Sequence, residues 1–224
     1  MAIRSDGEKT RRDILDAACQ IFAEKGYDEA THTEICGLAG VNSASVNYHF
    51  GSKEELYRAT WQHLVDQAVR AYPHGGGVRG DAAFEDRLRG FLGSILSKIV
   101  DPRLACLHRI RLMEIARPTG MLDRSLAKPL GMCRRDADAL LMDLLGESID
   151  KQTLEFCALS VLGPCLSLQQ ALYGRGICPT RIYSNEEVEE MLDHMVSFSM
   201  AGLREILHRG DSWHEMKNIR MSRS

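Results

Sequence analysis

The sequence lacks most features of a secreted, membrane-spanning or disulfide-bonded protein. Its 224 residues contain no uninterrupted apolar run near the roughly 18–20 residues that a membrane-spanning helix needs. The first residues, MAIRSDGEKTRR, lack the apolar segment of a signal peptide. The seven cysteines are scattered, odd in number and without a CxxC pair, which is typical of buried thiols. These absences predict a cytoplasmic protein without a membrane partner.

Motifs for catalysis, cofactors and metals are also missing. The sequence contains neither HExxH nor GxSxG. Gly75, Gly77 and Gly80 match a dinucleotide fingerprint in spacing, but that motif needs a preceding strand, and a helical pattern precedes it here. A flexible loop is the favoured interpretation. Cys106 and His108 lack a second pair at metal-ligand spacing, so a surface histidine beside a buried cysteine is expected. We therefore expect no enzyme, no cofactor and no metal site.

Helical periodicity covers nearly the whole chain, and prolines and glycines cluster at a few positions between the helical segments. A first helix is expected from about Glu8 to Glu24, ended by Gly26. Thr31 stands three residues before Glu34, the spacing of a capping box, so a second, short helix should begin there.

The next signals complete a helix-turn-helix. Gly40 allows a tight turn, and Asn42 caps a third helix over about Ser43–Phe50. Ser52 and Glu55 have the spacing of another capping box and open a longer helix. The segment PHGGGVRG then interrupts the helical pattern. Beyond it, helices are expected over 81–100, 103–117, 121–145, 150–173 and 185–209, followed by a polar tail that frays. The chain is therefore predicted to be all-α.

The third helix has a face suited to the major groove of DNA. If Val46 points into the core, Ala44 and Tyr48 point most directly outward, flanked by Ser45 and Asn47. Alanine can touch a thymine methyl group, and asparagine can bind adenine through two hydrogen bonds. The expected DNA-binding residues, with His49 and Lys53 for phosphates, are Thr31, Asn42, Ser43, Ala44, Ser45, Asn47, Tyr48, His49 and Lys53.

Charge does not favour this interpretation, and geometry alone leaves open a polar helical hairpin without a DNA role. The net charge is −3, and residues 1–60 contain seven Lys and Arg against ten Asp and Glu. Nucleic-acid-binding domains are often basic overall. DNA binding must therefore rest on local cationic and polar groups.

The last predicted helix carries two apolar stripes. A helix with two apolar faces needs two partners, which are either its own domain and a second subunit or the core of a monomer. We favour a homodimer, with these interface residues on one stripe: Met191, Met195, Phe198, Gly202 and Ile206.

Two segments resemble the TetR family of transcriptional regulators. These are TRRDILDAACQIFAEKGYDEAT, residues 10–31, and GVNSASVNYHFGSKEELY, residues 40–57. NYHF is similar to the CecR-like branch of that family, as are RIRLMEIARPT at 109–119 and LSVLGPC at 159–165. Much of the family has Tyr where Asn47 stands, and Met113 and Pro164 depart from the commoner Arg and Gln.

The resemblance implies an all-α protein with a three-helix DNA-binding domain, followed by a helical ligand-binding and dimerisation domain. It implies a DNA-binding domain at 1–50, a connecting helix at 51–72, a loop at 73–80, a ligand-binding and dimerisation domain at 81–209 and a tail at 210–224. The function so implied is a ligand-responsive repressor that binds a palindromic double-stranded DNA operator as a homodimer.

A small, largely apolar effector is expected to bind the C-terminal domain and release the DNA. The expected lining residues are Phe91, Ile95, Arg109, Met113, Glu114, Met142 and Gln169. Three alternatives remain open from the sequence. The helices could complete a packed core without a ligand, the chain could be an α-helical enzyme or small-molecule carrier, or it could be an interaction module without DNA binding.

Overall fold

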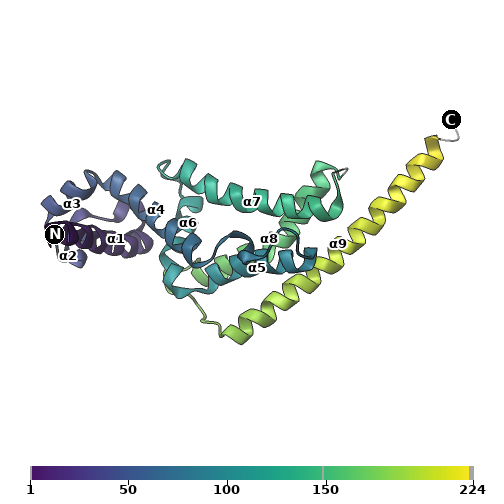
Figure 1. Ribbon diagram of the computed structural model, residues 1–224. Helices are drawn as coiled ribbons and strands as arrows, with labels where there is room; N and C mark the ends of the chain where they lie inside the picture. The colour runs from purple at the N-terminus through teal and green to yellow at the C-terminus, as the bar shows by residue number, and fades with distance from the viewer. Residues whose placement is uncertain (1, 148, 222–224) are drawn as a thin grey trace. The chain divides into compact units, whose positions relative to one another are not determined.

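A computed structural model describes the backbone of residues 2–147 and 149–221, with side chains over 7–73, 75–122, 133–147 and 149–209. The elements in chain order are α1 (Ala2–Glu29), α2 (His32–Ala39), α3 (Ser43–Phe50), α4 (Lys53–Ala71), the 3₁₀ turn η1 (His74–Gly77), α5 (Phe84–Val100), the 3₁₀ turn η2 (Pro102–Leu104), α6 (Ala105–Ala116), α7 (Asp123–Leu145), α8 (Lys151–Tyr173) and α9 (Asn185–Met221) (Figure 1). The described residues contain no strand, and the all-α prediction is confirmed. The side chains of the predicted tail, 210–224, lie outside the described residues.

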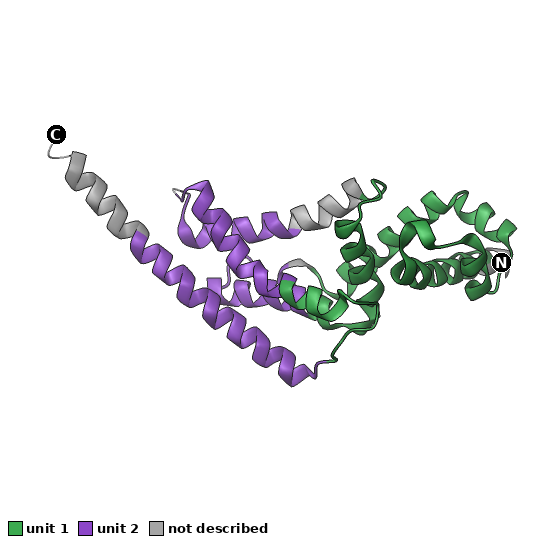
Figure 2. Cartoon of the chain, turned by 180° about the vertical axis from the view of Figure 1, so that it is seen from behind, with its two compact units in different colours: residues 1–73, 97–131, 167–182 green, residues 74–96, 132–166, 183–224 purple. Residues whose placement is uncertain are grey.

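The chain forms two compact units (Figure 2). Unit 1 comprises residues 1–73, 97–131 and 167–182, and unit 2 comprises 74–96, 132–166 and 183–224. Helices α5, α7 and α8 each contribute residues to both units. Neither unit is therefore a continuous stretch of sequence.

Local capping interactions build the helix-turn-helix of unit 1. Thr31 and Glu34 form the predicted capping box at the start of α2. Gly40 ends that helix in the left-handed conformation, at φ 66°, which favours glycine because it has no Cβ. The Asn42 side chain then accepts a hydrogen bond from Ser45 N at 2.9 Å and opens α3. The predicted helix, turn and helix are confirmed.

The capping box predicted at the start of α4 is only half formed. Ser52 Oγ accepts from Glu55 N at 3.1 Å. The reciprocal bond is missing, because Ser52 N donates instead to Phe50 O at 2.8 Å and the Glu55 carboxylate pairs with Arg58 at 3.1 Å. A nearby cation thus competes successfully for the carboxylate.

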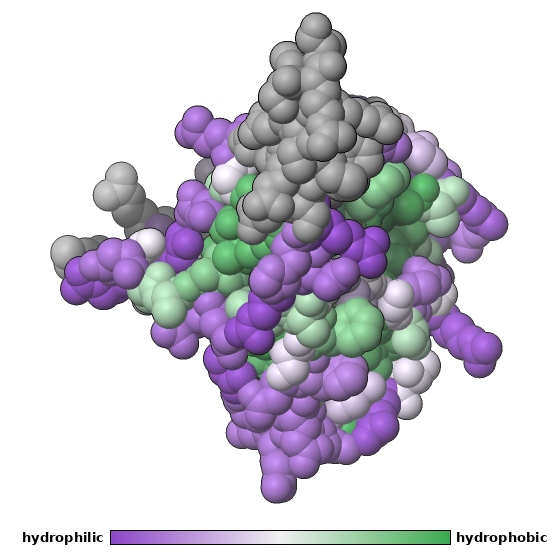
Figure 3. Space-filling view, turned by 90° about the vertical axis from the view of Figure 1, so that its right-hand side faces the viewer, coloured by the Kyte–Doolittle hydropathy of each residue, from purple (hydrophilic) through white to green (hydrophobic). Residues whose placement is uncertain are grey.

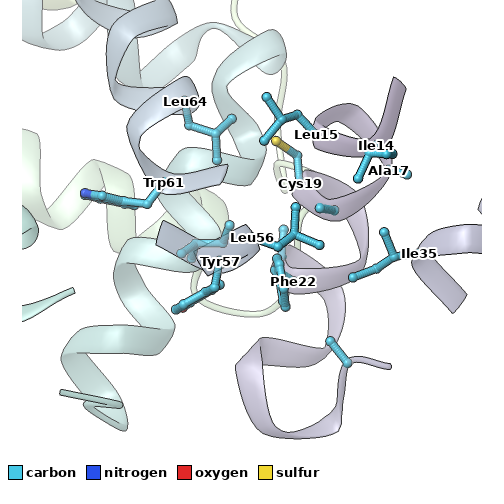
Figure 4. Packing of buried hydrophobic residues seen from close by; sticks show 14 of the residues in the cluster. Ile14, Leu15, Ala17, Cys19, Phe22, Ile35, Leu56, Tyr57, Trp61 and Leu64 are labelled. Carbon is cyan, nitrogen blue, oxygen red and sulfur yellow. The ribbon is translucent and has the colours of Figure 1, made fainter. Parts of the chain in front are cut away.

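One hydrophobic core joins the first four helices to α6. Figure 4 shows its centre, where Phe22 of α1, Ile35 of α2 and Leu56 of α4 meet. Leu107 and Ile110 of α6 belong to the same core. Burying a side chain of this size contributes about 1.5–3 kcal/mol. The helix-turn-helix is therefore supported by α6, and not only by its own three helices.

Ion pairs at the surface of unit 2 link α5 to α7 and to α9. Arg89 of α5 pairs with Glu189 of α9 at 2.7 Å and also with Asp193. Arg87, on the same helix, pairs with Asp143 of α7 at 2.7 Å. Exposed pairs of this kind contribute little to stability each, so apolar packing must supply most of it.

The glycine-rich segment before α5 was expected to be a flexible loop, but it lies directly against α5. A Cβ added to Gly90 would be 2.6 Å from Gly75 O and 2.4 Å from a methyl carbon of Val78. Gly75 and Gly76 both have positive φ, 70° and 63°, which allows the tight turn. The glycines therefore serve close backbone packing, and α4 precedes them where a dinucleotide site would need a strand.

Helix α8 is apolar on more than one face. Among the described residues it is the one helix long and apolar enough to cross a membrane by length and composition, with 39% of the relevant window buried in the protein. Cys157 and Val161 are buried, whereas Phe156, Leu159 and Leu166 are exposed. Apolar side chains are visible at the surface in Figure 3. The hydropathy of α8 thus reflects a buried face together with an exposed apolar face.

Candidate nucleic-acid interface

The outward face of α3 consists of short and polar side chains. Val46 and Phe50 are 1% and 8% exposed, so this helix packs its i and i+4 positions into the core. Ala44 and Tyr48 lie on the opposite side, where the Tyr48 side chain is 85% exposed, and Asn47 is exposed beside them. The predicted orientation of α3 is confirmed. A protruding phenol, an amide and a methyl group on one helix suit contact with base edges.

Two other predicted DNA-binding residues, Thr31 and Asn42, form the helix caps. Asn42 Oδ1 accepts from both Ser45 N and Ser45 Oγ, at 2.9 and 3.0 Å. Thr31 Oγ1 donates to a Glu34 carboxylate oxygen at 2.9 Å, and Lys25 pairs with the same carboxylate. Thr31 and Asn42 are exposed, so these caps fix the starts of α2 and α3 at the protein surface. Ser43, the first residue of α3, is also exposed.

Two cationic side chains near α3, those of Lys53 and Arg11, each lie over an aromatic ring. Lys53 Nζ lies 4.5 Å from the centre of the Tyr27 ring and donates to Asp28 O at 3.3 Å. The Arg11 guanidinium lies 5.1 Å from the centre of the Phe50 ring. His49 packs edge-on against the ring of Tyr48. Lysine has three donors and the bond to Asp28 O uses one, so Lys53 can still donate to a phosphate.

Sequence reasoning missed Arg11, although a signal was present. Arg11 precedes Ile14, Leu15 and Ala18 by three, four and seven residues, so helical spacing aligns it with the apolar stripe of α1, and the structure leaves it exposed at the end of that stripe. From this position its guanidinium contacts the Phe50 ring through a cation–π interaction.

The residues expected to line a ligand cavity belong to different units. Phe91, Ile95 and Met142 are in unit 2, whereas Arg109, Met113, Glu114 and Gln169 are in unit 1. Phe91 is 5% exposed and Met142 is 39% exposed. Met113 of α6 reaches Gly26, where its methyl carbon would be 3.5 Å from an added Cβ.

The polar members of that set in unit 1 bind other protein groups. Arg109 Nη1 donates to the carbonyl oxygens of Tyr173 and Gly174 at 3.3 and 3.1 Å. These carbonyls end α8, so a cation here also interacts favourably with the helix dipole. Gln169 Nε2 lies 2.9 Å from His108 Nδ1. In the structure, Arg109 and Gln169 thus join α6 to α8.

His108 is buried, which makes the expected surface position wrong. It is 3% exposed, whereas Cys106 is only partly buried. His108 Nε2 lies 2.7 Å from Lys98 O, and its ring stacks on Tyr173. Because the Lys98 carbonyl can only accept, Nε2 carries the proton and Nδ1 accepts from Gln169. Both ring nitrogens are satisfied, which lowers the cost of burial.

Burial of His108 predicts a loss of stability in mild acid. Burial lowers the pKa of His108 from 6.5 to about 4, so the unfolded chain binds the proton more tightly. Stability from this residue is complete above pH 6.5 and falls as the pH drops from 6.5 towards 4, by up to about 3 kcal/mol. Urea unfolding at pH 7.5, 6.5 and 5.5 measures it. His108→Gln should remove this part of the pH dependence, and equal slopes for both proteins would contradict the assignment.

The fold and the α3 face together define a helix-turn-helix regulator of transcription. Residues 14–60 match the family model of bacterial regulatory proteins of the tetR family, and residues 84–203 match that of the C-terminal domain of the HTH-type transcriptional dual regulator CecR. The chain belongs to the TetR family and has a C-terminal domain of the CecR type. The regulators of this family are not enzymes, so the enzyme alternative is dropped.

Individual relatives agree with this assignment. The chain is 42% identical over 65 residues to the dual regulator CecR of Shigella flexneri, covering 29% of each protein. It is 32% identical over 71 residues to the negative regulator IcaR of Staphylococcus epidermidis, covering 30% of this chain and 38% of IcaR. The matches thus span less than half of either relative. A crystal structure of a TetR-like regulator from a Rhodococcus species has the same fold, with a TM-score of 0.60, 21% identity and coverage of 86% of this chain and 96% of the other.

Proposed function

We propose that this chain is a homodimeric, cytoplasmic repressor that binds a palindromic DNA operator through α3 and releases it when a small-molecule effector binds. The observation that carries the proposal is the outward face of α3, where Ala44, Asn47 and Tyr48 are exposed on a helix whose other side is fixed in the core. We call the helix-turn-helix of α2 and α3, with α1, the DNA reader. A reader followed by a CecR-type domain in the same chain supports the same function.

DNA recognition divides between base edges and phosphates. Asn47 binds adenine through its amide, Ala44 contacts a thymine methyl group, and Tyr48 reaches farthest into the groove. Lys53 and Arg11 contact phosphates and set the register of the helix in the groove. Because residues 1–60 contain more acidic than basic groups, these few cations carry much of the electrostatic attraction.

Replacing Lys53 by alanine should weaken binding to all duplexes about equally. A lost phosphate contact removes attraction that is independent of sequence and reduces the slope of log affinity against log salt by about 1. Titrations of operator and of unrelated duplex at several salt concentrations measure both effects. Lys151→Ala, at an exposed lysine of unit 2, is the control. A loss confined to the operator would contradict the phosphate role of Lys53.

Dimerisation is supported by exposed apolar side chains on α8 and α9 of unit 2. Phe156, Leu159 and Leu166 of α8 are 56%, 53% and 48% exposed, and Phe198 of α9 is 73% exposed. A second copy related by a two-fold axis would cover these side chains and place two readers on a palindrome. The centres of the half-sites should then lie about 34–36 Å apart, one helical turn of DNA.

The predicted interface residues on α9 differ in exposure. Gly202 is exposed, and Met191 and Ile206 are partly buried. Met195 is 7% exposed and packs within its own chain. The proposed interface therefore centres on Phe198 and on the exposed face of α8, with Met195 supporting the helix from behind.

The proposal also covers the sign of regulation and the residues that hold the effector. CecR is named a dual regulator and IcaR a negative regulator, so the sign of regulation differs between relatives. We infer repression here, with a small apolar effector held by unit 2 residues such as Phe91, Ile95 and Met142. Arg109 and Gln169 have other hydrogen-bond partners and are the weaker candidates for orienting a ligand.

Selection of bound sequences from random duplex DNA tests the proposal most directly. Enrichment of a palindrome supports it, and titrating that duplex against compounds found by thermal shift identifies the effector. Failure to enrich any sequence would favour an interaction module without DNA binding. An effector that tightens DNA binding would overturn the release mechanism alone.

A further inference from the structure

A buried carboxylate joins the connecting helix α4 to α6. Glu114 is 2% exposed. Its Oε1 accepts from the Tyr57 hydroxyl at 2.7 Å and from Thr119 Oγ1 at 2.8 Å. Its Oε2 accepts from Thr119 N at 3.1 Å. Three donors from two other segments thus converge on one carboxylate. We call Tyr57, Glu114 and Thr119 together the Glu114 cluster.

Tyr57 connects this cluster directly to the DNA reader. It is 2% exposed, and its ring packs edge-on against Phe22 of α1 with the centres 4.7 Å apart (Figure 4). The same ring lies 5.2 Å from that of Tyr27, which in turn holds Lys53. Burial, and then the bond to Glu114, raise the pKa of Tyr57, so its hydroxyl stays a neutral donor. One side chain therefore touches both α1 and α6.

Helix α6 is fixed at its other end by separate interactions. His108 lies within hydrogen-bonding distance of Lys98 O and Gln169, and Arg109 binds the last carbonyls of α8. All these residues belong to unit 1. Hydrogen bonds are directional, so the bond from Tyr57 to Glu114 constrains the tilt of α4 on α6 in addition to the apolar core that the two helices share.

We propose that the Glu114 cluster sets the angle of the reader on α6 and thereby the half-site spacing that the dimer accepts. The inference rests on the proposed function, since spacing has meaning only for a dimer on a palindrome. It gives Glu114 a positioning role in place of the ligand-orienting role expected from the sequence. In a two-fold dimer any change of reader angle appears twice, which makes half-site spacing a sensitive measure.

Binding to operators of altered spacing tests the inference. The selected palindrome is compared with versions that have one base pair added or removed between the half-sites. The unmodified protein should bind the matched duplex about tenfold more tightly than the altered ones, and Tyr57→Phe should reduce this ratio to about threefold. Affinity for unrelated duplex should stay unchanged, because the phosphate-binding residues are intact. A simple loss of stability would leave the spacing ratio unchanged.

Thr60→Val is the matched control. Thr60 is a buried residue of the same helix, and its hydroxyl donates to Leu56 O within α4 at 2.8 Å. This variant should keep the full spacing ratio, whereas Thr119→Val, which removes another donor to Glu114, should lower it. Circular dichroism and light scattering establish that each variant is folded and dimeric. An unchanged ratio in both cluster variants overturns the inference alone. Absence of selective binding by the unmodified protein overturns the proposed function and the inference with it.

Discussion

Replacing Asn47 and Tyr48 together by alanine is expected to remove most operator selectivity while the protein stays folded. Each side chain is exposed on α3, so its loss disturbs no core contact. Each lost base contact should cost about 1–3 kcal/mol, so the single variants should each weaken operator binding by about 5- to 150-fold. Affinity for unrelated duplex should change little, because base contacts add nothing there.

Fluorescence titration of operator and of unrelated duplex measures this result. Gln20→Ala, at an exposed position of α1, serves as the control for removing a surface side chain. Because residues 47 and 48 are neighbours, their effects need not add, and both single variants belong in the experiment. Full operator affinity in the folded double variant would show that α3 does not read the bases.

Placing aspartate at both Phe156 and Phe198 is expected to convert the dimer into a folded monomer. Both phenylalanines are more than half exposed, so each chain can fold without them. Because the dimer is two-fold symmetric, the two substitutions replace four phenylalanine side chains in the interface. Burial of each contributes about 1.5–3 kcal/mol, and the aspartates add unpaired charges there. The operator should then bind one reader at a time, with a large loss of affinity.

Light scattering at micromolar concentration gives the assembly state directly. Ile182→Asp is a closely matched control, because Ile182 is also 73% exposed but belongs to unit 1. Met195→Asp should behave differently and unfold unit 2, since Met195 is 7% exposed within its own chain. A double variant that remained dimeric would place the interface elsewhere.

The reader could be predicted from the sequence because its signals are local. Thr31, Gly40 and Asn42 act on groups within four residues of themselves, so spacing along the chain is enough. The outward direction of Tyr48 followed from helical geometry once Val46 was placed in the core. The half-formed box at Ser52 shows the limit of such local reasoning, because Arg58 was an equally local competitor for Glu55.

Local patterns determined the helices, their caps and the face that α3 presents, because these depend on neighbours along one turn. The tertiary structure decided what the central polar residues do. Tyr57 and Glu114 are 57 positions apart, and Arg109 meets carbonyls 64 and 65 positions away, so no spacing rule could pair them. Likewise, Met195 and Phe198 lie on one predicted stripe of α9, yet one is buried and the other exposed. Which of the two side chains packs against its own chain depends on the helices beside α9. Helical periodicity does not identify those neighbouring helices.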